Sequence, residues 1–118
     1  MHTLTKLSLA LALGFVGTTA ANASAPFDGT WSVQLTTQKG HCDASYSWSV
    51  AVNDGRFTDA GLFMQAAGSI NARGRVNLEV THGSDVLAAT GAVKGQIGRG
   101  DWRSPTMRCS GAWVAVRS

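Results

Sequence analysis

The sequence lacks the short motifs that mark several large enzyme classes. It has no Gly-x-Ser-x-Gly element for a serine nucleophile, no His-Glu-x-x-His zinc motif, no P-loop and no dinucleotide-binding fingerprint. Charged residues make up only 14% of the 118 residues, with a formal net charge of +3. No recognisable nucleic-acid-binding module is present, and arginines do not alternate with aromatic residues. We therefore expect neither an enzyme nor a nucleic-acid-binding protein.

Residues that ligate metals are also scarce. The chain has three histidines and two cysteines, and the only cluster is His41-Cys42-Asp43. Consecutive residues of a strand point to opposite faces, so these three side chains would not converge on one ion. We expect no metal site and no cofactor.

Acidic residues offer one alternative to a non-enzymatic protein. Asp59, Glu79 and Asp101 are the candidates for the paired carboxylates of a hydrolase. Glu79 has the parity of a polar strand face, and Asp101 stands between Arg99 and Arg103 as a surface charge partner. Asp59 has the parity of Phe57, which predicts that its side chain points inward, so it is the strongest catalytic candidate of the three. The alternative is an ordinary aspartate at the end of a strand. A small hydrolase using Asp59 or Asp101 remains the enzymatic alternative.

The first 23 residues have the organisation of a signal peptide. Lys6 precedes an apolar run over 7–16 that is too short to span a bilayer, and small residues follow it. Cleavage after Ala23 is preferred to cleavage after Ala25, because the latter would leave Pro26 at the new terminus. A buried N-terminal helix is the alternative. We expect a single exported domain over 24–118, in the periplasm of a bacterium or secreted from it.

Two cysteines in an exported domain predict one disulfide, Cys42–Cys109. A domain of about 95 residues buries only about 60–65% of its unfolded surface, so its core is thin. Closing a loop of about 68 residues stabilises the fold by about 4 kcal/mol in the chain-entropy model.

Alternating apolar residues and frequent turn signals predict an all-β fold. Trp31, Val33 and Leu35 share one parity, as do Val76 and Val80 in a later segment. Turn signals such as Asn53-Asp54-Gly55 recur about every ten residues. We expect an antiparallel up-and-down meander closed into a barrel, with an open sheet or a flattened sandwich as alternatives. The expected strands are 29–37, 44–53, 56–61, 66–71, 74–81, 86–93, 96–103 and 108–117.

Three Gly-x-Trp triplets begin at Gly29, Gly100 and Gly111. Because the last two are eleven residues apart, we expect them on a terminal hairpin, close to Cys109. The first, with Trp31 and a late arginine, resembles the calycins, which include lipocalins, avidins and small bacterial metalloprotease inhibitors. The resemblance implies that Arg117, or else Arg108, lies over the Trp31 indole and closes one barrel end. It also implies binding of a small ligand or, as in the inhibitors, of a partner protease.

Aromatic residues are the best candidates for a binding site. The expected ligand-binding residues are Trp31, Tyr46, Trp48, Phe57 and Trp113, for which core packing is the alternative role. Leu62-Phe63-Met64, if exposed, would form a protein-contact tip. We expect a non-enzymatic binding protein for a small apolar ligand or a partner protein. An envelope-associated interaction module without a pocket is the alternative, and the oligomeric state stays open.

Overall fold

The computed structural model describes residues 25–58 and 64–118 of the chain. A short 3₁₀ helix at Ala25–Phe27 precedes the first strand. The strands are β1 (Gly29–Lys39), β2 (Ser45–Asn53), β3 (Arg56–Phe57), β4 (Gln65–Ile70), β5 (Arg75–His82), β6 (Asp85–Lys94), β7 (Ile97–Ser104) and β8 (Cys109–Arg117).

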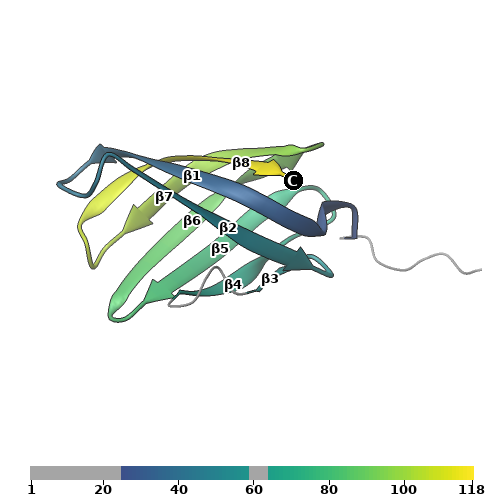
Figure 1. The fold of residues 1–118 in the computed structure, drawn as a ribbon, viewed down its shortest axis with the longest axis horizontal. Coiled ribbons are helices and arrows are strands. Elements are labelled where there is room, and N and C mark those ends of the chain that lie inside the picture. Colours follow the sequence, from purple (N-terminus) through teal and green to yellow (C-terminus); the bar gives the residue numbers. More distant parts are fainter. Residues whose placement is uncertain (1–24, 59–63) are drawn as a thin grey trace, which may run out of the picture.

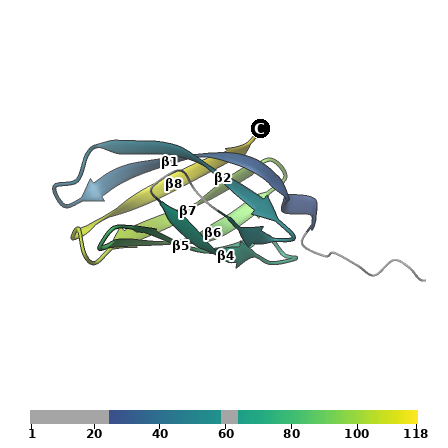
Figure 2. The same cartoon turned by 60° about the horizontal axis from the view of Figure 1, so that its bottom comes forward.

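The eight strands form one closed antiparallel barrel in chain order (Figures 1 and 2). Each strand pairs with the next, and β1 pairs with β8 to complete the ring. The predicted all-β meander and its closure are therefore confirmed, and the open sheet and the sandwich are excluded. Closure pairs every strand on both sides, although β3 joins β2 through only two residue pairs and β4 through only one.

Strict alternation along the strands places the core inside the barrel. On β1, Trp31, Val33 and Leu35 are buried while Ser32 and Gln34 between them are exposed. β5 repeats the pattern over Val76, Leu78 and Val80. Successive side chains of a strand point to opposite faces, so one parity fills the interior and the other meets water.

The expected strand boundaries agree closely with the observed ones, except at β3. This strand was expected over 56–61 and is seen only over Arg56–Phe57, with a single pair, Arg56 to Ser69, joining it to β4. Residues 59–61 lie outside the described residues. Asp59, Leu62, Phe63 and the expected signal peptide with its cleavage sites also lie outside them.

The predicted disulfide is confirmed and joins the loop after β1 to the first residue of β8. Cys42 and Cys109 are bonded, and their Cα atoms are 6.1 Å apart. Gly40 is essential to this corner, because a Cβ atom there would lie 2.4 Å from the Arg108 carbonyl oxygen. Its φ of +97° is also one that glycine adopts without strain.

The last two Gly-x-Trp triplets pair with each other across β7 and β8. Gly100 lies opposite Trp113, and Trp102 lies opposite Gly111. A Cβ atom on Gly100 would come within 2.6 Å of the Trp113 Nε1 atom, so the indole occupies the space that the glycine leaves. The predicted terminal hairpin with close packing is therefore observed.

Candidate functional site

One end of the barrel, which we call the sealed end, is covered by the segment before β1 (right of Figure 1). The Arg117 guanidinium lies over the Trp31 ring, 5.3 Å from its centroid. The Trp31 indole donates a hydrogen bond to the Phe27 carbonyl at 2.9 Å. Gly29 makes room, since a Cβ atom there would lie 3.2 Å from Arg117 Cδ. Arg108, the second candidate for this position, precedes β8 at the opposite end of the barrel.

Hydrogen bonds hold Arg117 and the segment before β1 together at the sealed end. The Nη1 atom of Arg117 donates to the carbonyls of Pro26 (2.5 Å) and Asp28 (3.0 Å), and its Nε atom donates to the Gln96 side chain (2.8 Å). The Asp28 carboxylate accepts the backbone N–H groups of residues 54 and 55 in the β2–β3 turn. Arg117 and Asp28 therefore tie together the segment before β1, the β2–β3 turn and the β6–β7 turn.

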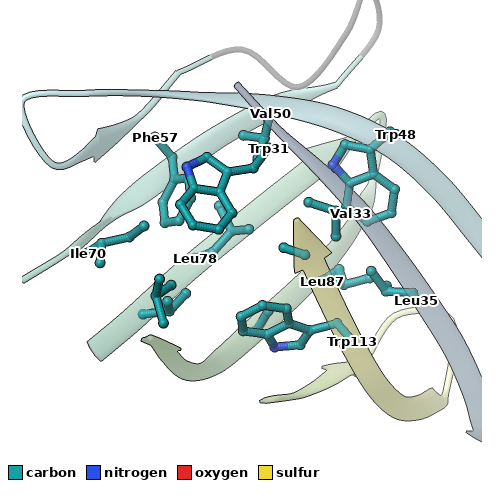
Figure 3. Close-up of a pocket in the computed structure, with 14 residues that line it drawn as sticks. Trp31, Val33, Leu35, Trp48, Val50, Phe57, Ile70, Leu78, Leu87 and Trp113 are labelled. Atoms are coloured by element: carbon teal, nitrogen blue, oxygen red, sulfur yellow. The ribbon is translucent and has the colours of Figure 1, made fainter. Parts of the chain in front are cut away.

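The barrel interior contains a small cavity of about 30 Å³ (Figure 3). At about 24 cal/mol per Å³, such a void costs only about 0.7 kcal/mol, so the interior is a packed core. Every side chain around it is apolar: Trp31, Val33, Leu35, Trp48, Val50, Phe57, Ile70, Val76, Leu78, Leu87, Ala89, Val93, Trp113 and Ala115.

The other end of the barrel, the open end, contains a larger hollow of about 180 Å³. Its floor is apolar and its rim carries polar groups. It is lined by Leu35, Tyr46, Ser47, Trp48, Met64, Val80, His82, Asp85, Val86, Leu87 and Met107. The β1–β2, β5–β6 and β7–β8 connections meet at this end (left of Figure 1). The disulfide lies there too, since Cys42 is in the β1–β2 connection and Cys109 begins β8.

Local hydrogen bonds shape the walls of this hollow. The Ser104 hydroxyl donates to the Val86 carbonyl at 2.6 Å and accepts the Met107 N–H, while the Thr106 hydroxyl accepts the Val86 N–H. Both backbone groups of Val86 are thus satisfied, one by the last residue of β7 and one by the β7–β8 loop. On the facing side, the Tyr46 hydroxyl accepts the N–H of Asp43 at 3.2 Å. These hydrogen bonds fix both sides of the rim.

Three side chains, Leu35, Trp48 and Leu87, line both the cavity and the hollow. They form a partition one side chain thick between the open end and the core. Figure 3 shows the Trp48 indole at the edge of the cavity, beside Val33. Trp48 is half-buried, whereas Leu35 and Leu87 are buried.

The structure divides the five expected ligand-binding residues between these two spaces. Trp31, Phe57 and Trp113 line only the core cavity, Tyr46 lines only the hollow, and Trp48 lines both. Met64, which was expected in a protein-contact tip, is half-buried and lines the hollow. The sequence did not point to other residues of the hollow, such as His82 and Met107. Their common signal is position: each stands beside a connection at the end where Cys42 and Cys109 lie.

The acidic candidates that the structure describes lie away from the hollow. Asp101 and Glu79 are exposed, and neither lines the cavity or the hollow. Within residues 25–58 and 64–118, no three His, Cys, Asp or Glu side chains gather in a way that could hold a metal ion. In the same part of the chain, no helix has the length and hydropathy that crossing a membrane requires.

Comparison of the sequence with protein-family models and with curated proteins finds no match to this chain.

Proposed function

We propose that this protein is an exported, non-enzymatic barrel that binds one small apolar ligand at its open end. The observation that carries the proposal is the hollow of about 180 Å³ over an apolar floor. An apolar cavity of about 150 Å³ is enough to hold benzene, so the hollow suits a ligand built on a single ring. The core cavity of about 30 Å³ is too small for such a molecule.

The disulfide supports export, and the geometry of the sealed end supports a calycin-like fold. A disulfide persists in an oxidising compartment, which agrees with the signal-peptide pattern. The barrel has eight strands in chain order, with Arg117 over Trp31, as the calycin resemblance implies. Membership of that family is part of the proposal.

Contacts before β1 favour a small ligand over protease inhibition. In the inhibitors that this chain resembles, an N-terminal tail enters the protease. Here the carbonyls of Pro26 and Asp28 are bound by Arg117, and the Phe27 carbonyl is bound by Trp31. These residues cover the barrel end instead of projecting from it.

The experiment is calorimetric titration of the disulfide-bonded protein with toluene, a probe of one ring. We expect one site per molecule. Val80 is buried and lines the hollow, so Val80→Phe should fill part of it and weaken binding at least about tenfold. Val116 is 47% exposed on the outer surface, so Val116→Phe is the matched control and should bind as the wild type does. The absence of binding by the wild type would contradict the proposal.

The second candidate function is contact with another protein molecule through an uncharged outer face. In register across β8, β1 and β2, its exposed or half-buried rows are Ala112-Thr36-Ser45, Val114-Gln34-Ser47 and Val116-Ser32-Ser49. The cores of protein interfaces are depleted in charged residues.

Charged residues of β1 and β8 stand only at the strand ends, as Lys39 and Arg117, whereas Arg99, Asp101 and Arg103 are exposed along β7. If the uncharged face mediates self-association, sedimentation equilibrium will show a dimer that Gln34→Glu dissociates and Arg99→Glu does not. A monomer at all concentrations would remove this form of the candidate.

The hydrolase alternative has a direct test. Asp101 is exposed on β7, and Asp59 lies outside the described residues. If Asp59→Ala and Asp101→Ala leave every detectable hydrolase activity unchanged, a hydrolase using either residue is excluded.

A further inference from the structure

The four tryptophans differ in the fate of their indole N–H groups. Trp31 donates to the Phe27 carbonyl, Trp102 to the Thr36 carbonyl at 3.1 Å, and Trp113 to the Thr90 carbonyl at 3.0 Å. Three indoles are therefore satisfied by backbone oxygens.

The fourth indole, that of Trp48, has no partner. Its Nε1 atom is shielded from solvent and is the one buried side-chain polar atom without a hydrogen bond in the part of the chain that the structure describes. Buried polar groups are nearly always paired, because an unpaired donor has lost its water without replacement. The protein atoms that the structure describes supply no acceptor for this donor.

A water in the core cavity is a poor candidate for that partner. The core cavity of about 30 Å³ is large enough for one water, but its walls are entirely apolar side chains. The N–H groups of Trp31 and Trp113 are already bonded. A water there would have a single partner, whereas buried waters need two to four.

The position of Trp48 indicates where a partner would come from. Trp48 belongs to the partition between the core cavity and the open-end hollow, and the two other members, Leu35 and Leu87, have no polar side-chain atom. The polar side chains of the hollow, which include Tyr46, His82 and Asp85, line its rim. Trp48 therefore has the only donor in the floor formed by these three side chains.

We propose that the open-end hollow selects ring-sized apolar ligands that carry one uncharged hydrogen-bond acceptor, such as a carbonyl oxygen, and that Trp48 Nε1 donates to that acceptor. The inference rests on the proposed binding function and adds the chemical class of the ligand. Because Nε1 is covered in the free protein, the proposal requires the indole to turn when the ligand binds.

The test compares acetophenone with isopropenylbenzene, which has nearly the same shape and a methylene group in place of the carbonyl oxygen. Both are titrated into the disulfide-bonded wild type, Trp48→Phe and Trp102→Phe. Trp102 lines neither the cavity nor the hollow, so Trp102→Phe is the control for the substitution itself. The ratio of the two dissociation constants is compared between proteins, which cancels the intrinsic difference between the ligands.

We expect Trp48→Phe to reduce the preference for acetophenone about tenfold, and Trp102→Phe to leave it unchanged. If both ligands bind and the ratio is the same in the wild type and Trp48→Phe, the inference about the acceptor is wrong and the binding function stands. If neither ligand binds the wild type, the binding function is wrong, and the inference with it.

A spectroscopic measurement on the wild type keeps the test decisive even if Trp48→Phe does not fold. The nitrogen–proton correlation spectrum shows one indole signal for each of the four tryptophans, and that of Trp48 is assigned through Phe variants of the other three. We expect acetophenone to move the Trp48 proton signal downfield and isopropenylbenzene not to do so. Equal shifts with both ligands would overturn the proposal.

Discussion

The two ends of this barrel are closed by different means. At the sealed end, Arg117 covers Trp31 and bonds to three partners, and Asp28 holds the β2–β3 turn. At the open end, a disulfide and short loops surround a hollow of about 180 Å³. The comparison teaches that an arginine laid over an indole, with its hydrogen bonds, can cover one end, while a covalent bond can hold the other end together without filling it.

The largest expected effect is at the open end, where the disulfide provides the stability. Replacing both cysteines, Cys42→Ser with Cys109→Ser, should lower the free energy of unfolding by about 4 kcal/mol, because the unfolded chain regains the entropy of a long loop. Urea unfolding measures this loss. A loss below about 1 kcal/mol would show that the strand pairing of β1 with β8 already holds this end.

The next effect is at the sealed end. Arg117→Ala removes the cation over the Trp31 indole and the hydrogen bonds to Pro26, Asp28 and Gln96. We expect a loss of about 2 kcal/mol in unfolding free energy. Arg99 is exposed on β7, so Arg99→Ala is the matched control and should change stability by less than about 0.5 kcal/mol. Equal losses for the two variants would contradict the closure described above.

The smallest effect compares one tryptophan from each end. Trp31→Phe removes an indole that donates to the Phe27 carbonyl, whereas Trp48→Phe removes an N–H without a partner. Both variants lose ring volume, but only Trp31→Phe also loses an indole hydrogen bond and changes the ring beneath Arg117. In thermal unfolding, Trp48→Phe should be less destabilising by about 1 kcal/mol. If Trp48→Phe is the more destabilising, Trp48 Nε1 has a partner in the free protein.

Much of the fold could be predicted from the sequence, because its determinants are local. The parity of Trp31, Val33 and Leu35 decides which face of β1 is buried, and Asn53-Asp54-Gly55 supplies the two consecutive positive φ angles of a tight turn. The disulfide followed from the even cysteine count in an exported domain.

The candidate site could be predicted only in part, because it depends on residues distant in sequence. Parity places Trp48 and Trp113 inside the barrel, but it does not tell which space each one lines. The Trp113 N–H is satisfied only because the Thr90 carbonyl lies within reach on β6. The residue most remote in sequence from Trp48 in the hollow, Met107, belongs to the loop before β8, and only barrel closure brings it there.

The most direct test of the account is to map where a small aromatic ligand binds. Acetophenone is titrated into the isotope-labelled protein, and backbone and indole signals are followed by NMR. The predicted changes are confined to the open end, at Ser47, Trp48, Leu87 and Met107, with none at Gly29, Trp31 or Arg117. Changes at the sealed end or on the uncharged face, or no change at any signal, would contradict it.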